Sequence, residues 1–213
     1  MLFRSKAPEY HCKALAIREK VLGTEHSNTA SSYNNIGSMY SQMGDYDKAL
    51  DYHGKGLAIR EKVLGLEHPD TASSYNSIGL AHDNLGDYDK ALEYHGKALA
   101  IREKVLGLEH PDTASSYSNI GVVHTEMGDY DKALEYHSKA LAIREKVLGT
   151  EHPDTATSYI NIGAVYYYMG DYGKALECYR KALEIRNRTL GENHTETTKI
   201  QKTIDFIKSQ MDG

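Results

Sequence analysis

The segment Gly44-Asp-Tyr-Asp-Lys-Ala-Leu50 recurs along the chain and decides how the rest of the sequence is interpreted. It returns unchanged at 86–92 and 128–134, and at 170–176 with Gly173 in place of the second aspartate. The step between copies is 42 residues each time. A period of this length is typical of repeat proteins, in which each unit gains a hydrophobic core only by stacking on its neighbours. The repeat therefore predicts an elongated solenoid whose function lies in a groove rather than in a closed pocket.

The first half of each unit carries the signals of a helix. In the copy at 65–106, Pro69 and Asp70 suit a first helical turn. Proline lacks the N–H that would have no partner there, and aspartate favours the positive end of the helix dipole. We expect this helix to run to Leu85 and to stop at Gly86.

The second half of the unit predicts another helix. Asp87 is a candidate N-cap, and the helix is expected to run through Leu106 to a left-handed stop at Gly107. Apolar or small side chains recur at helical spacing in both halves. These are Tyr75, Ile78, Gly79 and His82 in the first helix, and Ala91, His95, Ala98, Ile101 and Val105 in the second. The sequence contains no strand-like alternation, so the fold class is all-α.

This pattern resembles the tetratricopeptide repeat (TPR), a helix–turn–helix unit of about 34 residues. The matching residues are Tyr75, Ile78, Gly79, His82, Gly86, Tyr88, Ala91, Ala98 and Leu99. The usual proline at the end of the unit is absent, and the segments 100–107 and 109–114 are similar to the 42-residue subclass of kinesin light chains. The resemblance covers about residues 9–197 and implies a right-handed TPR-like α-solenoid of about ten antiparallel helices.

The repeat divides the chain into a single array over residues 1–213. We expect the second helix of a partial repeat at 8–22, full repeats at 23–64, 65–106, 107–148 and 149–190, and a capping helix at 191–213. Pro8 stands where later copies carry Leu50, so regular helix should begin near it. The first helix of the partial repeat is missing, which favours a piece cut from a longer array over a degenerate repeat.

The last helix looks like the end of the stack. Its apolar residues form one stripe, made of Ile200, Ile204, Ile207 and Met211. Asp205 stands at the site that holds Gly163 in the previous repeat, and a charged side chain there would block a further helix. This polar outer face is typical of a capping element.

Composition narrows the class of partner and the compartment. The net charge of −5 argues against nucleic acid, which requires a basic surface, but allows a basic peptide. No apolar run approaches the length of about 18 residues that spans a bilayer, and no secretory leader is visible. Cys12 and Cys178 lie four repeats apart, so reduced thiols and a cytoplasmic location are expected.

The copies differ from one another mainly in the first helix. Copies 65–106 and 107–148 are identical at 34 of 42 positions, and seven of the eight differences lie in the stretch 76–85 and its counterpart. In the subclass that the sequence resembles, first helices line the concave groove. Variation on the ligand-reading face and drift on an exposed surface after recent duplication are both consistent with this pattern.

We therefore expect peptide-binding residues in the groove made by the first helices. The candidates are Asn34, Asn35, Ser38, Gln42, Asn76, Asp83, Asn84, Ser118, Asn119, Thr125, Glu126, Ile160, Asn161, Ala164, Tyr167 and Tyr168. A ladder of four asparagines could satisfy a peptide backbone with amide donors and acceptors, and the kinesin-light-chain resemblance implies this use. The ladder would consist of Asn34, Asn76, Asn119 and Asn161. Tyr167 and Tyr168 are candidate aromatic anchors, although packing against the capping helix is an alternative role for them.

The histidines of the chain predict structure rather than chemistry. His26, His68, His110, His152 and His194 recur at helix starts, and His53, His82, His95, His124 and His137 replace aromatic core residues. No short Cys/His cluster is present, so no metal or other cofactor is expected. Nearly every Ser, His and Asp is copied at equivalent sites, which argues against an enzyme.

The sequence predicts a non-enzymatic protein-interaction scaffold with an extended peptide in its groove. The alternative is an architectural array without a dedicated peptide ligand, which could self-associate through its truncated N-terminal end.

Overall fold

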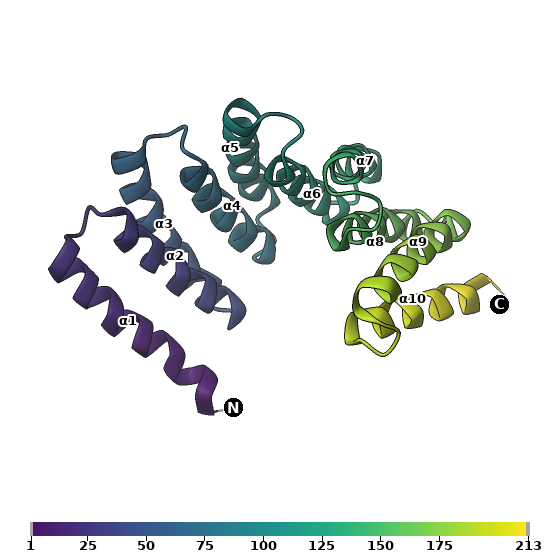
Figure 1. Cartoon of the computed structure of the whole chain (residues 1–213), viewed down its shortest axis with the longest axis horizontal. Helices are drawn as coiled ribbons and strands as arrows, with labels where there is room; N and C mark the ends of the chain where they lie inside the picture. The colour runs from purple at the N-terminus through teal and green to yellow at the C-terminus, as the bar shows by residue number, and fades with distance from the viewer. Residues whose placement is uncertain (1, 212–213) are drawn as a thin grey trace. The chain divides into compact units, whose positions relative to one another are not determined.

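The computed structural model describes residues 2–211, which form helices and no strands (Figure 1). The chain divides into two compact units, at the boundary between Leu106 and Gly107. The first unit holds α1 (Leu2–Leu22), α2 (Ser27–Gln42), α3 (Tyr46–Leu64), α4 (Pro69–Asn84) and α5 (Tyr88–Leu106). The second holds α6 (Pro111–Glu126), α7 (Tyr130–Val147), α8 (Pro153–Tyr168), α9 (Tyr172–Leu190) and α10 (Thr195–Met211). Each unit is a stack of helix pairs, as predicted.

A histidine directly precedes each first helix and caps it. The Nδ1 atoms of His26, His68, His110, His152 and His194 accept a hydrogen bond from the backbone N–H two residues later, at 3.0–3.2 Å. The ring nitrogen thereby satisfies one of the N–H groups that a helix start leaves without a partner. The prediction of Pro69 and Asp70 in the first turn is confirmed. The sequence also placed a histidine at each helix start, and the structure shows that this histidine caps the helix.

The second helices begin after aspartate as the sequence predicts, although Asp129 makes no capping bond to α7 and that helix ends at Val147. Asp45 and Asp171 accept from the backbone N–H three residues on, at 3.3 and 3.1 Å, and α5 starts directly after the equivalent Asp87. Gly65 and Gly107 follow the helices with φ of 91° and 89°, a conformation that costs other residues energy.

The buried stripe of the second helix ends on an arginine rather than on an apolar residue. In α5, Ala91, His95, Ala98 and Arg102 are buried. Val105, which we expected to complete the stripe, is 46% exposed, so that prediction is wrong. The buried positions follow spacings of four, three and four residues. Val105 continues this spacing but lies in the last turn of α5, which ends at Leu106. Ile101 is half-buried beside the stripe.

Glycine allows the two helices of a repeat to meet. A Cβ atom on Gly79 in α4 would lie 2.8 Å from both Cε1 and Nδ1 of the buried His95 in α5. The same contact recurs between Gly37 and His53, and between Gly121 and His137. Because the imidazole is enclosed, it cannot swing away from an added methyl group.

We therefore expect Gly79→Ala to lower the free energy of unfolding by about 1–2 kcal/mol, because overpacking outweighs the gain in helix propensity. The matched control is Gly96→Ala in α5, where an added Cβ would meet no atom within 4 Å. That change should raise the free energy of unfolding by about 0.5–1 kcal/mol. Denaturant titrations of both variants check the prediction, and a stabilised Gly79→Ala protein would contradict the close approach.

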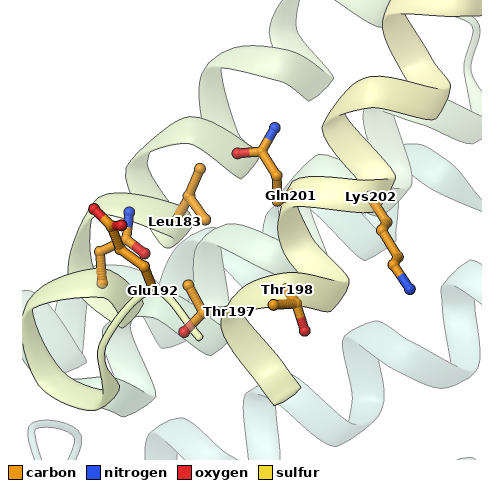
Figure 2. Close-up of a pocket in the computed structure, with 7 residues that line it drawn as sticks. Leu183, Glu192, Thr197, Thr198, Gln201 and Lys202 are labelled. Carbon is orange, nitrogen blue, oxygen red and sulfur yellow. The ribbon is translucent and has the colours of Figure 1, made fainter. Parts of the chain in front are cut away.

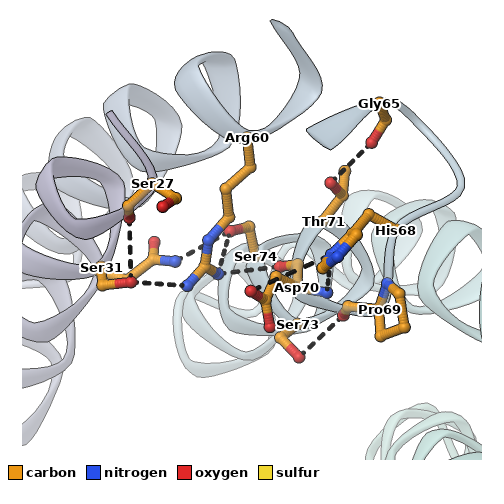
Figure 3. Close-up of polar contacts among 11 residues, drawn as sticks. Ser27, Ser31, Arg60, Gly65, His68, Pro69, Asp70, Thr71, Ser73 and Ser74 are labelled. Atoms are coloured by element: carbon orange, nitrogen blue, oxygen red, sulfur yellow. Dashed lines mark hydrogen bonds and ion pairs between the residues drawn. The ribbon is translucent and has the colours of Figure 1, made fainter. Parts of the chain in front are cut away.

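Consecutive repeats are joined through a buried guanidinium group (Figure 3). Arg60 at the end of α3 is 9% exposed, and its Nη1 donates to the backbone oxygen of Asp70 and to Ser74 Oγ in α4, both at 2.8 Å. Its Nη2 donates to Ser31 Oγ in α2 at 3.5 Å. Arg144 repeats the bond to serine in the second unit, at 2.8 Å from Ser158 Oγ. One side chain thus links three helices.

The turn beside this arginine is held by a threonine, whereas a surface ion pair ties α3 to the turn between α1 and α2. Thr71 Oγ1 donates to the backbone oxygen of Gly65 at 2.8 Å, and the bond recurs at residues 29, 113 and 155. Lys62 on α3 pairs with Glu25 in the preceding turn, and both side chains are exposed. The buried bonds are therefore the stronger part of the repeat junction.

The two ends of the described chain depart from expectation. The first helix begins at Leu2 rather than near Pro8, which lies inside it. Proline biases the residue before it away from helix but does not forbid a helix across it. At the other end, Ile200, Ile204 and Ile207 of α10 are buried as predicted. Met211 is exposed, however, because it lies in the last turn of α10.

Candidate functional site

The first helices of consecutive repeats touch within each unit, α2 with α4 and α6 with α8. In the first unit they form a cleft of about 280 Å³. Six of its lining residues come from the two first helices, and two come from α3. The lining consists of Ser38, Ser41, Gln42, Ser77, Leu80 and Asn84, with Tyr46 and His53 from α3.

The second unit contains the same cleft two repeats further along. It appears as two adjoining hollows of about 170 and 190 Å³ that share Thr125, Glu126 and Tyr168. Its lining consists of Val122, Thr125, Glu126, Asn161, Ala164 and Tyr168 from the first helices, with Tyr130 and His137 from α7. Each of these residues lies 84 positions, or two repeats, after its counterpart in the first cleft.

The second helices contribute the same residue types to both clefts, whereas the first helices contribute different ones. Tyr46 and His53 have identical counterparts, Tyr130 and His137, whereas all six first-helix positions carry a different residue. The first cleft is lined by neutral side chains. In the second, Glu126 replaces Gln42 and Tyr168 replaces Asn84, which adds a negative charge and an aromatic ring.

The histidines in the two clefts are uncharged at neutral pH. His53 and His137 are almost fully buried, and burial lowers the pKa of each to about 4, with a nearby arginine adding to the shift. His53 Nδ1 lies 3.3 Å from Asn34 Oδ1. His137 Nδ1 has no hydrogen-bond partner among residues 2–211, because Ser118 stands where Asn34 would be. Glu126 is thus the only carboxylate among the lining residues.

The rim of each cleft is organised differently. In the first, Tyr46 donates through its hydroxyl to Asn84 Oδ1 at 3.1 Å, while Asn84 Nδ2 donates to the backbone oxygen of Leu80. In the second, the rings of Tyr130 and Tyr168 stack, with centroids 6.2 Å apart and planes 8° from parallel. Tyr168 is 59% exposed and therefore presents much of its ring to solvent.

Half of the predicted groove residues line the clefts. These are Ser38, Gln42, Asn84, Thr125, Glu126, Asn161, Ala164 and Tyr168. The other eight lie elsewhere on or inside the first helices: Asn35, Asn76, Asp83, Asn119, Ile160 and Tyr167 are exposed or half-buried outside the lining, and Asn34 and Ser118 are buried.

The asparagines do not form one ladder. Asn34 and Asn76 occupy one position of the repeat, and Asn119 and Asn161 occupy the next, about 100° further round the helix. Asn34 donates to Ser74 Oγ at 2.9 Å, and Asn76 Oδ1 lies 3.1 Å from His95 Nδ1. The amide of Asn34 is thus committed to the interior, and its predicted role in peptide binding does not fit this placement.

Tyr167 and Tyr168 also have different surroundings. The ring of Tyr167 lies 5.7 Å from that of Tyr172 and 6.3 Å from that of Phe206 in α10. It therefore packs against the last helix, which is the alternative role considered for this pair. Only Tyr168 of the two lines the cleft.

Sequence reasoning missed the residues that the second helices contribute. Tyr46, Tyr130, His53 and His137 line the clefts although the groove was assigned to first helices alone. The tyrosine recurs in every copy and the histidine in three of the four, a pattern typical of structural residues. Tyr46 and Tyr130 could have been found from the repeat itself, since they follow directly after the turn that brings the two helices together.

Neither a metal centre nor a membrane span is found in the described chain. Within residues 2–211, no group of three or more His, Cys, Asp or Glu side chains is placed to hold a metal ion. No helix in that part of the chain combines the length and the apolar character needed to cross a bilayer.

Comparisons with solved structures find close matches in fold. The chain superposes on BtubC (BKLC) from P. vanneervenii with a TM-score of 0.75 and 29% identity, over 90% of this chain and 76% of that one. It also matches the nearly identical TPR-like repeats of a Podosopora anserina protein assigned as a kinesin light chain. The TM-score is 0.70 with 26% identity, over 88% of this chain and 89% of that one. A glutamine-to-methionine variant of those repeats gives a TM-score of 0.73 with 26% identity, over 87% of this chain and 88% of that one.

Sequence comparison agrees with the structural matches. No curated protein sequence matches the chain. The family model described as tetratricopeptide repeat matches it five times, at residues 6–62, 42–104, 70–146, 112–188 and 156–203. These matches run through both units and bear out the resemblance seen in the repeat itself. The chain belongs to the tetratricopeptide repeat family, with kinesin-light-chain-like proteins among its structural relatives.

Proposed function

We propose that this chain is a binding scaffold that holds an extended segment of a partner protein against its first helices. Tetratricopeptide repeats generally mediate interactions between proteins. The two clefts would each accept side chains of the bound segment, and the residues on their rims would select them.

One observation carries this proposal. The clefts recur at equivalent positions, their second-helix residues are identical, and all six of their first-helix residues differ. Residues that hold repeats together, such as Arg60, Thr71 and His68, recur at equivalent positions instead. Change at every first-helix position of the lining, beside unchanged second-helix positions, is the pattern expected where copies read different parts of a ligand.

The test begins with a selection of random dodecapeptides displayed on phage against the intact chain. For a selected peptide, we expect Tyr168→Ala to weaken binding by about 2 kcal/mol, because exposed aromatic residues tend to dominate binding energy. Calorimetry measures the loss, and circular dichroism checks that the variant is folded.

The matched control is Tyr10→Ala, which removes a tyrosine that is 65% exposed on α1, outside both clefts. This change should leave the affinity nearly unaltered. A selection that yields no binder, or equal losses for the two variants, would contradict groove binding.

Self-association is the second candidate, and the surface of α1 favours it. Tyr10, Ile17 and Val21 are all exposed on this helix, although apolar residues at such spacing usually face a neighbour. Sedimentation of the intact chain over a range of concentrations tests this candidate. A dimer that is lost in an Ile17→Glu/Val21→Glu variant, together with a failed peptide selection, would place the architectural role first.

A further inference from the structure

A separate cavity lies in the second unit, between α9, α10 and the turn that joins them. Its volume is about 430 Å³, and Figure 2 shows the side chains that surround it. Leu183 and Asn187 come from α9, Glu192 from the turn, and Thr197, Thr198, Gln201 and Lys202 from α10. None of these residues belongs to either cleft.

Earlier repeats show what normally fills this position. At three junctions, a tyrosine of the first helix donates through its hydroxyl to a glutamate of the preceding second helix. The pairs are Tyr33 with Glu19, Tyr75 with Glu61, and Tyr159 with Glu145. Burial and the bond to glutamate raise the pKa of Tyr75 to about 12, so its hydroxyl stays protonated and able to donate.

The last junction has lost both partners of this bond. Gln201 stands 42 residues after Tyr159, and Asn187 stands 42 residues after Glu145. Gln201 Nε2 donates to Asp205 Oδ1 at 2.9 Å along α10, so its amide is bonded away from Asn187. The space of a tyrosine ring is therefore left open, with Leu183 as an apolar wall.

Two buried oxygen atoms around this space have no hydrogen-bond partner in the described part of the chain. They are Asn187 Oδ1 and Thr197 Oγ1, and the Thr197 side chain is 2% exposed. In the preceding repeat, the equivalent Thr155 donates to Gly149 at 2.8 Å. A buried polar atom without a partner is costly, so a ligand that supplies one gains affinity.

We propose that this cavity binds the side chain of a tyrosine from a partner protein, with its phenol hydroxyl donating to Asn187 Oδ1. The ring would take the place that Tyr159 fills one repeat earlier. A cavity of about 150 Å³ is enough for a benzene ring in another protein, so the volume suffices here. The free acceptor favours tyrosine over phenylalanine. This inference does not depend on ligand binding in the clefts.

The test uses N-acetyltyrosinamide and N-acetylphenylalaninamide as probes of the intact chain, with binding followed by saturation-transfer NMR. We expect the tyrosine probe to bind about fivefold more tightly, the equivalent of one net hydrogen bond. Asn187→Leu should remove this preference, with little change for the phenylalanine probe.

The matched pair of variants is Gln201→Tyr and Gln201→Ala, both at an exposed position. The tyrosine should fill the cavity, abolish binding of both probes and raise the denaturation midpoint, whereas the alanine should leave binding intact. Absence of binding to the unaltered chain would overturn the proposal even if Gln201→Tyr is stabilising, because the cavity would then be only a void. Equal affinity for the two probes, or binding that survives Gln201→Tyr, would also overturn it.

Discussion

Acidification from pH 7 to pH 5 is expected to destabilise the protein by several kcal/mol. His53, His95 and His137 are buried in successive repeats, and burial lowers the pKa of each to about 4. In the unfolded chain, histidine titrates near 6.5. Between these two values the unfolded state binds more protons, so stability falls as the pH falls. The slope is about 1.4 kcal/mol per pH unit for each histidine. Urea titrations at pH 7, 6 and 5 measure this effect above the range in which carboxylates titrate.

The chain offers its own control for this effect, because Tyr179 stands in the fourth repeat where the other three carry histidine. His95→Tyr should make the dependence on pH shallower, and Tyr179→His should make it steeper. An unchanged slope in both variants would show that the buried imidazoles do not control acid stability.

Removal of the buried arginine at a repeat junction is expected to have the next largest effect. Arg60→Ala should lower the free energy of unfolding by about 2–3 kcal/mol, because Ser74 Oγ and the backbone oxygen of Asp70 lose a charged donor inside the protein. Guanidinium titrations followed by circular dichroism give the value. Since arrays can unfold in stages, the midpoint and the width of the transition should be compared together.

Lys62→Ala provides the comparison, since Lys62 also bonds from α3 to a neighbouring segment, but it pairs with Glu25 of its own repeat on the surface. Its loss should cost less than about 1 kcal/mol. A larger cost for Lys62 than for Arg60 would contradict the assignment of the junction to its buried bonds.

The sequence predicts the fold well because the same helix-start and helix-end residues recur from copy to copy. Gly107 ends α5 and Pro69 begins α4 as the pattern requires, and each prediction is tested again in the next copy. The burial of Arg102 could not be predicted in this way. A charged residue is assigned to the surface unless its partners are known, and the corresponding partners of Arg60 lie in the following repeat.

The site was predicted only in part, for a geometric reason. Asn34 and Asn119 look alike in the sequence, yet they occupy neighbouring positions of the repeat and therefore point in different directions. Whether an amide faces solvent or His53 depends on packing between helices, which periodicity alone does not resolve. The cavity beside Gln201 was not predicted because it depends on the absence of a tyrosine, at the position that Tyr159 fills one repeat earlier.

The identical junctions have a consequence for how such a protein changes over generations. Arg60 bonds to Ser74 of the next copy in the same way as Arg144 bonds to Ser158 of the next copy, so this contact does not depend on which copies adjoin. Unequal recombination between copies would thus add or remove a 42-residue unit without creating a new kind of boundary. The number and order of clefts can then vary in a lineage while each step still yields a folded chain.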